Sequence, residues 1–262
     1  MQAHACFKFF ISHLQMPTLR KILDILTDVY IMPRTCPVCG SRLEENEKAM
    51  CTACLIKLPV CHERGPEIFD MRSAVSNASV LCGMVQAWFH YDPASQYAEL
   101  IRTAKYRDTP SLAYELGHLF ARDLKQRLPE NTEAGPMHVC DIDVLLPMPM
   151  HFFKRIRRGY NQAEELARGM GDELGIPVAD NLIALKPHST QTRLSYRKRT
   201  ANLRGTMAVN DAHELRGMNV GIVDDIITTG SSMTEAAVSL SWSMPHMASL
   251  SFLALGLTRK KN

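Results

Sequence analysis

The sequence predicts an α/β protein: a mostly parallel β-sheet covered by helices on both faces and preceded by a small cysteine-rich module. Three observations lead to this prediction. Between residues 81 and 262, apolar stretches of strand length alternate with amphipathic stretches of helix length. Residues 36–54 hold four of the eight cysteines, arranged as two CxxC pairs. With 262 residues, the chain is long enough for one large core and a small additional module.

The expected domain organisation follows these changes in pattern along the chain. Apolar residues at helical spacing predict an amphipathic helix over residues 19–30, which Pro33 ends. Residues 63–80 show no strong period and contain Gly65 and Pro66, which favours a linker. The four predicted parts are an N-terminal extension with this helix (1–33), a cysteine module (34–62), the linker (63–80) and an α/β domain (81–262).

Within the α/β domain, each element is predicted from its apolar period and from its flanking turn residues. Runs rich in branched and aromatic residues predict strands, which fall at 84–92, 143–150, 181–186, 219–224 and 248–257. Apolar residues on one helical face predict helices, which fall at 93–104, 111–127, 161–175 and 231–243. Gly175 is the expected C-cap of the third of these helices.

The bulk composition is that of an ordinary soluble protein, with 46% apolar residues, 22% charged residues and a formal net charge of +3. So small a charge is not typical of a dedicated duplex-DNA binder, and any preference for anions must come from local clusters. No stretch reaches the roughly 18 consecutive apolar residues that a membrane span needs. The apolar N-terminal stretch lacks the small-residue cleavage site of a secretory signal. We therefore expect a cytoplasmic protein.

The two CxxC pairs, Cys36 with Cys39 and Cys51 with Cys54, predict a closed structural zinc site. Two CxxC turns can bring four thiolates to one point, in a module too small to fold by its core alone. This clustering of four cysteines, with the other four scattered, argues against a disulfide framework and favours a metal site in a reducing compartment. The alternatives to Zn²⁺ at this site are free thiols and an iron–sulfur cluster.

A second site is predicted at "VGIVDDIITTGSS", residues 220–232, where a strand passes through a loop into a helix. Ligands of parallel α/β sheets bind at such junctions. Gly230 at the helix start lets backbone N–H groups approach a phosphate. Asp224 and Asp225 would repel that phosphate but could accept hydrogen bonds from a neighbouring diol. A phosphate site close to a diol site is what a ribose 5-phosphate requires. Hydroxyl donors to the phosphate would come from Thr228, Thr229 and either Ser231 or Ser232.

These thirteen residues resemble the phosphoribosyl-diphosphate (PRPP) signature of the type I phosphoribosyltransferases, in which apolar positions, two acids and two more apolar positions precede TTG. Other motifs resemble one subgroup, the ComF/GntX family. They are "LIRTAKYRD" with Lys105 and Tyr106, "LLPMPMHFFKRIRRGYNQAEELA", "QTRLSYRKRTANLRG" with Gln191, Leu194, Arg199 and Asn202, and the "CPVCG" and "CTAC" pairs of an N-terminal zinc ribbon. The resemblance covers about residues 19–257, in five separate motifs at the expected order.

The chain departs from the family pattern at three places. Tyr160 stands where Phe is usual, and "SSM" replaces the common "ATL" after TTG. Of the second cysteine pair that many members carry, only Cys61 is present, with Arg64 where a cysteine would fall. The first zinc site is therefore expected, whereas a second metal site is in doubt.

The resemblance implies a type I phosphoribosyltransferase-like fold and a role for each part of the site. Asp224 and Asp225 would be the catalytic pair that holds the ribose hydroxyls. The residues implied for the 5′-phosphate are Ile227, Thr228, Thr229, Gly230, Ser231 and Ser232. Those implied for pyrophosphate are Pro147, Met148 and Pro149 in the loop that ends at His151, together with Arg155, Arg158, Asn161, Gln162 and Arg199. Mg²⁺ would bridge the pyrophosphate and the ribose hydroxyls with few protein ligands.

Solvated surface roles are the alternative reading of the basic runs, Arg155 to Arg158 and Arg197 to Arg199, and Lys105 is an open candidate for the site. For Asn161 and Gln162 the alternative is a helix N-cap and a surface amide.

The resemblance also implies a function in natural competence, the uptake or handling of transforming single-stranded DNA, with a helicase or a recombination mediator as a partner. Two hypotheses stay open. In the first, the protein transfers a phosphoribosyl group to an acceptor that no residue pattern identifies. In the second, it binds PRPP or a nucleotide without turnover. A third, weaker hypothesis makes the zinc ribbon a single-strand DNA binder, but the ribbon has no aromatic residue between Cys36 and Cys54.

Overall fold

The computed structural model describes residues 34–61, 81–106, 109–127, 139–184, 207–210, 215–243 and 246–258. The expected helix at 19–30, the linker at 63–80 and the basic segment at 191–205, which contains Arg199, lie outside the described residues. The chain divides into two compact units, residues 1–55 and 56–262.

The described part of the first unit is the cysteine module. Its first CxxC pair lies on a tight turn, in which the N–H of Gly40 donates to the carbonyl of Cys36 at 2.8 Å. Gly40 has φ +74°, a left-handed conformation that favours glycine. The second CxxC pair lies at a short helix, α3 (Thr52–Ile56), with Cys51 directly before it and Cys54 inside it.

The second unit is built on a four-stranded sheet in the order β1-β6-β5-β2, in which every neighbouring pair is parallel. Its strands are β1 (Cys82–Tyr91), β2 (Val144–Pro147), β5 (Asn219–Ile227) and β6 (Ser249–Thr258). β6 is central, and nine of its ten residues are buried. Its nearly continuous apolar sequence follows from this position, because a strand covered on both faces has no side for polar residues.

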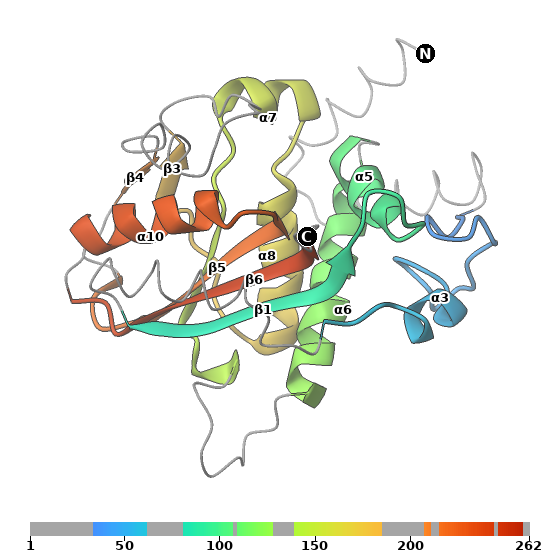
Figure 1. Cartoon of the computed structure of the whole chain (residues 1–262), viewed down its shortest axis with the longest axis horizontal. Coiled ribbons are helices and arrows are strands. Elements are labelled where there is room, and N and C mark those ends of the chain that lie inside the picture. The colour runs from blue at the N-terminus through green and yellow to red at the C-terminus, as the bar shows by residue number, and fades with distance from the viewer. Residues whose placement is uncertain are drawn as a thin grey trace, which may run out of the picture. The chain divides into compact units, whose positions relative to one another are not determined.

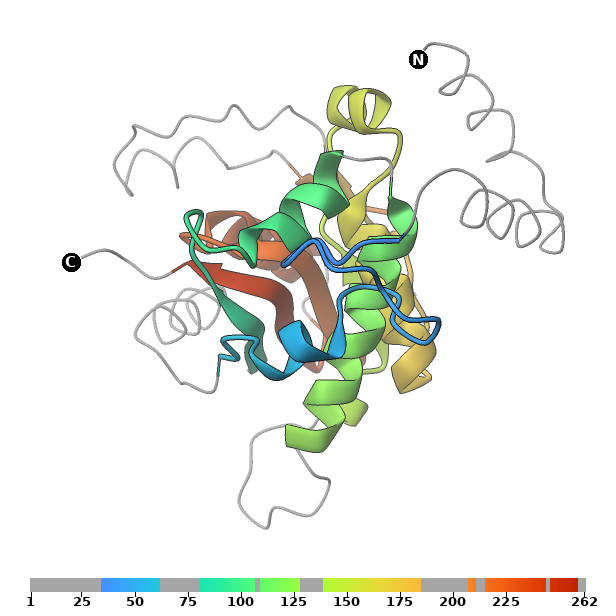
Figure 2. The ribbon, with the colours of Figure 1, turned by 90° about the vertical axis from the view of Figure 1, so that its right-hand side faces the viewer.

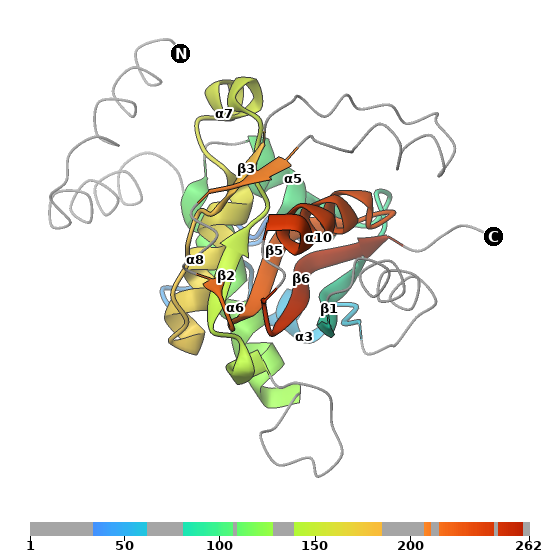
Figure 3. The ribbon, with the colours of Figure 1, turned by 90° about the vertical axis from the view of Figure 1, so that its left-hand side faces the viewer.

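Helices cover both faces of the sheet, α10 (Ser231–Ser243) on one face and α6 (Pro110–Arg127) and α8 (Gln162–Leu174) on the other (Figure 1). Figure 2 and Figure 3 show the same layers from the two sides. Two shorter helices, α5 (Ala98–Tyr106) and α7 (Phe152–Arg158), and a 3₁₀ turn, η1 (Val139–Asp141), complete the described helical elements. A separate antiparallel pair joins β3 (Leu182–Ala184) to β4 (Met207–Val209).

The core has one apolar layer on each side of the sheet. Met233, Ala236 and Leu240 of α10 are buried in a cluster with Ile222 and Phe252 of the two central strands. On the opposite side, helices α6 and α8 pack together closely. A side chain at Gly117 would clash with the backbone carbonyl of Leu166, and one at Gly169 with that of Tyr114. Trp88 of β1 stacks on Phe120 of α6, with ring centroids 5.8 Å apart.

The prediction of an α/β protein with a parallel sheet is confirmed. The helix expected at 231–243 has these bounds, and the helix expected at 161–175 runs from its N-cap Asn161 to its C-cap Gly175. The strand expected at 181–186 exists, but it belongs to the separate antiparallel pair. None of the helices in the described residues combines the length and apolar character needed to cross a membrane.

Four of the described elements were not predicted, namely α3, α7, the 3₁₀ turn η1 and β4. The strand expected to end at Asp224 continues to Ile227, so both acids lie inside β5 and not in a loop. The reason is the neighbouring strand. Ile226 pairs with Gly256 of β6 and Ile227 pairs with Leu257, and this ladder extends β5 past its polar residues.

Candidate functional site

The carboxyl ends of β2 and β5 lie side by side. The strands are parallel, and Pro147 at the end of β2 pairs with Val223 of β5. Directly after β2, the N–H of Met148 donates to the carbonyl of Val223 at 2.8 Å. The segment 147–149 therefore begins beside the two acids that follow Val223. This edge of a parallel sheet is where ligands of α/β proteins bind.

Asp225 is the centre of the polar contacts at this edge. Its Oδ2 lies 2.8 Å from the Nζ of Lys105 in the last turn of α5, and it accepts a hydrogen bond from the Nε2 of Gln162 at 2.8 Å. Asp225 is buried, with 8% of its surface exposed. A buried carboxylate is stable only when it is paired and hydrogen-bonded, and these two partners supply both. Three elements, α5, β5 and the start of α8, therefore meet at one carboxylate.

The turn between α7 and α8 fixes the amides of the site. Asn161 caps α8, because its Oδ1 accepts from the N–H of Ala163 at 3.1 Å, and its Nδ2 donates to the carbonyl of Met148 at 3.1 Å. Asn161 thus ties the start of α8 to the segment that follows β2. On the next residue, the Oε1 of Gln162 accepts from Arg158 at 3.0 Å. The chain Arg158–Gln162–Asp225–Lys105 is a continuous polar network.

Asp224 has a different environment from its neighbour. It is half-buried, and its Oδ1 accepts a hydrogen bond from the N–H of Asp225 at 2.8 Å. Loss of hydration, followed by repulsion from the Asp225 carboxylate, raises the pKa of Asp224 to about 8. Two adjacent acids with such different surroundings are typical of functional sites.

The loop after β5 leads into the first turn of α10. Gly230 is buried and has φ +70°, a conformation in which a side chain would be strained. Its carbonyl accepts from the N–H of Thr234 at 2.8 Å and so starts the helix. The Oγ1 of Thr229 lies 2.7 Å from the Oγ of Ser231. Because the first N–H groups of a helix have no partner within the helix, this turn offers donors and hydroxyls at the positive end of α10.

The structure brings some of the sequence-predicted residues together and separates others. Asp225, Gln162 and Arg158 share one network, and Lys105 joins them. Arg155 instead pairs with Glu164 of α8 at 3.2 Å and is more than half exposed. Arg199 lies outside the described residues. The remaining predicted residues line the ends of β2 and β5 and the start of α10, namely Pro147, Met148, Pro149, Asp224, Ile227, Thr228, Thr229, Gly230, Ser231 and Ser232.

Sequence reasoning missed a contact at the last turn of α5. The hydroxyl of Tyr160 donates to the carbonyl of Ala104, the residue before Lys105. The signal in the sequence is the position of Tyr160 between two motif residues, Gly159 and Asn161. A hydroxyl at that position fixes the last turn of α5 and thereby the lysine that reaches Asp225.

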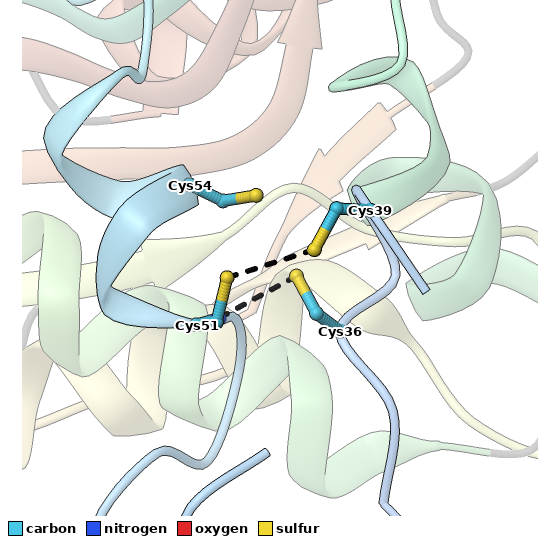
Figure 4. Close-up of side chains that lie close together, drawn as sticks. All are labelled: Cys36, Cys39, Cys51 and Cys54. Carbon is cyan, nitrogen blue, oxygen red and sulfur yellow. Dashed lines mark hydrogen bonds between the residues drawn. The ribbon is translucent and has the colours of Figure 1, made fainter. Parts of the chain in front are cut away.

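The four cysteines of the first unit form a compact cluster (Figure 4). The sulfur atoms of Cys36, Cys39, Cys51 and Cys54 all lie within 4.8 Å of one another. The Sγ atoms of Cys39 and Cys51 are 3.6 Å apart. A tetrahedral zinc with Zn–S distances of about 2.3 Å requires S–S separations of about 3.8 Å. The donor set and its spacing therefore fit structural Zn²⁺, as the sequence predicted.

The electrostatics of the cluster also fit a cation. Hydrogen bonds from the side chain and backbone of Ser41 lower the pKa of Cys39 to about 6, whereas burial and the neighbouring thiols raise the pKa of Cys54. Four thiols this close cannot all ionise without a compensating positive charge, which a divalent metal supplies. Glu47 holds the second CxxC turn, because its Oε1 accepts from the N–H and hydroxyl of Thr52 at 2.6 and 2.7 Å.

The parallel sheet and the Cys₄ cluster together define an α/β protein with a zinc-ribbon type of module at its N-terminal side. No family model matches the chain. Over 95 residues the chain is 36% identical to competence protein F of Haemophilus influenzae, a match that covers 36% of this chain and 42% of that relative. Over 96 residues it is 31% identical to the DNA utilization protein YhgH of Salmonella typhimurium and of Salmonella typhi, covering 36% of this chain and 41% of the relative.

The match thus spans about two fifths of the length of these curated relatives. These similarities and the four-cysteine cluster agree with the resemblance to the ComF/GntX family that the sequence motifs carry.

Proposed function

We propose that the second unit binds PRPP at the carboxyl edge of its sheet and that the protein acts in the uptake or handling of DNA. The observation that carries the proposal is the position of Asp225. It lies at the end of a central strand, five residues before the Gly230 turn, in contact with a lysine and an amide. A carboxylate, cations and a helix start at one sheet edge supply complementary groups for the diol, the pyrophosphate and the phosphate of one ligand.

The 5′-phosphate is assigned to the first turn of α10. The backbone N–H groups after Gly230 and the hydroxyls of Thr229 and Ser231 are donors suited to a phosphate. The ribose hydroxyls are assigned to Asp224 and Asp225, which precede that turn in the chain. Asp224 is the more exposed of the two acids, whereas Asp225 is the one that pairs with Lys105 through its Oδ2.

Pyrophosphate is assigned to the segment 147–149 and to the cations around it. The Arg158–Gln162 pair is held beside Asp225, and Lys105 is already at the carboxylate. Mg²⁺ bound together with PRPP would neutralise the charge of the pyrophosphate, and water would supply most of its ligands. When pyrophosphate leaves, negative charge collects on it, and Lys105 and Arg158 would stabilise that charge.

Two versions of this function differ in turnover. In the first, the protein transfers phosphoribosyl to an acceptor and releases pyrophosphate. In the second, it binds PRPP or a nucleotide as an accessory protein in the handling of single-stranded DNA. The names of the relatives, which refer to competence and to DNA utilization, support a role with DNA in either version. A helicase or a recombination mediator remains the proposed protein partner.

Ligand binding is tested by titrating PRPP in the presence of Mg²⁺ while the melting temperature is measured. We expect a rise in melting temperature that chelation of Mg²⁺ reduces and that Asp225→Asn largely removes. The matched control is Asp180→Asn, which neutralises an exposed aspartate outside the network. A ligand that binds the folded protein raises its melting temperature once the ligand concentration exceeds the Kd. If the melting temperature of the wild-type protein does not rise with PRPP at a concentration on the order of millimolar, the proposal of PRPP binding is wrong.

Turnover is tested separately, by measuring pyrophosphate release from PRPP with a panel of bases, amines and oligonucleotides. Release that depends on one acceptor class, and that Asp225→Asn abolishes, supports transfer. Binding of PRPP without release of pyrophosphate, whichever acceptor is present, supports the accessory function.

A further inference from the structure

Helix α7 carries an unusual concentration of exposed apolar side chains. Phe152, Phe153 and Ile156 are 65%, 70% and 64% exposed, and none of the seven residues of α7 is buried. Among the described residues only two other large apolar side chains, Ile56 and Leu81, are comparably exposed, and both lie in other segments. Adjacent exposed apolar residues are typical of a surface that binds a partner. α7 lies beyond the edge of the sheet, at the top of Figure 1.

These three side chains share one face of the helix. At about 100° per residue, Phe152, Ile156 and Phe153 occupy consecutive positions around α7, and Arg157 and Arg155 border them on either side. The rings of Phe152 and Phe153 are edge-to-face, with centroids 6.0 Å apart. We call these five residues the α7 patch. It offers two aromatic rings between two guanidinium groups.

The positive charge of α7 favours a negatively charged partner. Four of its seven residues are cationic and none is acidic. The side chain of Arg157 is exposed and makes no ion pair or hydrogen bond with the described part of the chain. Since the whole chain has a net charge of only +3, α7 is a local concentration of positive charge, although Arg155 is paired with Glu164 of α8.

Aromatic rings interleaved with cations match the chemistry of single-stranded nucleic acid, in which bases with exposed π-faces alternate with phosphates. A duplex hides those faces inside its stack. A membrane surface suits α7 less well, because interfacial helices bury a long apolar face and α7 has three apolar residues in two turns. We infer that the α7 patch binds single-stranded nucleic acid, with bases stacked on Phe152 and Phe153 and phosphates bound to Arg155 and Arg157.

This inference does not depend on PRPP binding. Arg155 pairs with Glu164 and is one of the residues that the family resemblance implies for pyrophosphate, so the test leaves it unchanged and alters Phe152, Phe153 and Arg157. All three are exposed, and substitutions at exposed positions have little effect on folding.

The experiment measures fluorescence anisotropy of a labelled oligothymidine of about 20 nucleotides, enough to cover a site of this kind. With the full-length protein, we expect Phe152→Ala with Phe153→Ala to weaken binding about tenfold or more. Replacing the same residues by Leu should weaken it as much, whereas replacement by Trp should preserve it, because Trp stacks and Leu does not. Arg157→Ala should lower the slope of log affinity against log salt by about 0.7.

The matched controls are Leu81→Ala, which removes an equally exposed apolar side chain, and Arg216→Ala, which removes an exposed arginine elsewhere. Both should bind like wild type. Equal affinity of wild type and the double Phe variant would overturn the inference. It would also be overturned if Leu restored binding as well as Trp, or if the protein bound phosphatidylserine vesicles through these residues and did not bind the oligonucleotide.

Discussion

The Nζ of Lys105 lies 2.8 Å from the Oδ2 of Asp225, and the two side chains, taken without their backbone atoms, are 19% and 12% exposed. The two residues are 120 positions apart in the chain, at the end of α5 and near the end of β5. Desolvated pairs of this kind are far more sensitive to loss of one partner than surface ion pairs. The contact therefore has consequences for stability that can be measured whether or not a ligand binds.

Removing the lysine should destabilise the protein through the acid left behind. We expect Lys105→Met to lower the free energy of unfolding by about 1–3 kcal/mol, since Asp225 keeps its hydrogen bond from Gln162 but loses its counter-charge. Lys105→Met combined with Asp225→Asn should cost less than the sum of the two single substitutions. Urea unfolding of the four proteins in this double-mutant cycle checks the coupling. Strict additivity would show that the contact does not contribute.

The raised pKa of Asp224 predicts a dependence of stability on pH. Its pKa rises from 3.8 to about 8 in the folded protein, so the folded state holds the proton more tightly than the unfolded state. The resulting stabilisation is complete below about pH 4 and is lost as the pH rises through about 8. Melting temperatures at about pH 6 and about pH 9 should therefore differ less in Asp224→Asn than in wild type. If the difference in melting temperature between the two pH values is the same in Asp224→Asn as in the control Asp180→Asn, the pKa of Asp224 is not raised in the folded protein.

The Cys₄ cluster predicts the metal content of the purified protein. We expect about one zinc per chain by elemental analysis, and its loss in Cys54→Ser. Cys82→Ser, which changes a cysteine outside the cluster, should retain the metal. A strong chelator should unfold the first unit, because binding of a structural metal is coupled to folding. Iron with visible absorption would indicate a cluster instead, and metal-free protein with an unchanged melting temperature on chelation would contradict both.

The close approach of α6 and α8 predicts that alanine lowers stability at two glycines of these helices, although helix propensity alone favours alanine over glycine. Gly117→Ala and Gly169→Ala place a methyl group against backbone carbonyls of the facing helix. Helix propensity would stabilise each variant by about 1 kcal/mol. We expect instead a destabilisation of about 1–3 kcal/mol, or a drop of about 2–4 °C in melting temperature for each kcal/mol. The control is Ser111→Ala at an exposed position of α6, which should be neutral or stabilising.

Local sequence patterns were sufficient to predict the elements whose apolar residues face the core. The helix at 231–243 was predicted with its observed bounds, because small hydroxyl residues start it and its apolar residues contact the sheet. Helix α7 was missed for the opposite reason. None of its residues is buried, so it has no core-facing period for a sequence pattern to reveal. The predicted end of β5 was wrong because pairing with β6 extends the strand.

The sequence by itself determined the chemistry available to this protein: two CxxC pairs, two adjacent acids before a TTG turn, and an alternation that predicts a parallel sheet. These features are local, because the spacing of a few neighbouring residues defines each of them. Only the tertiary structure decided which distant side chains meet those acids. Lys105 and Gln162 reach Asp225 because α5 and the start of α8 converge on the carboxyl end of β5. A pairing across more than sixty residues depends on how helices pack on the sheet, and no local pattern encodes that.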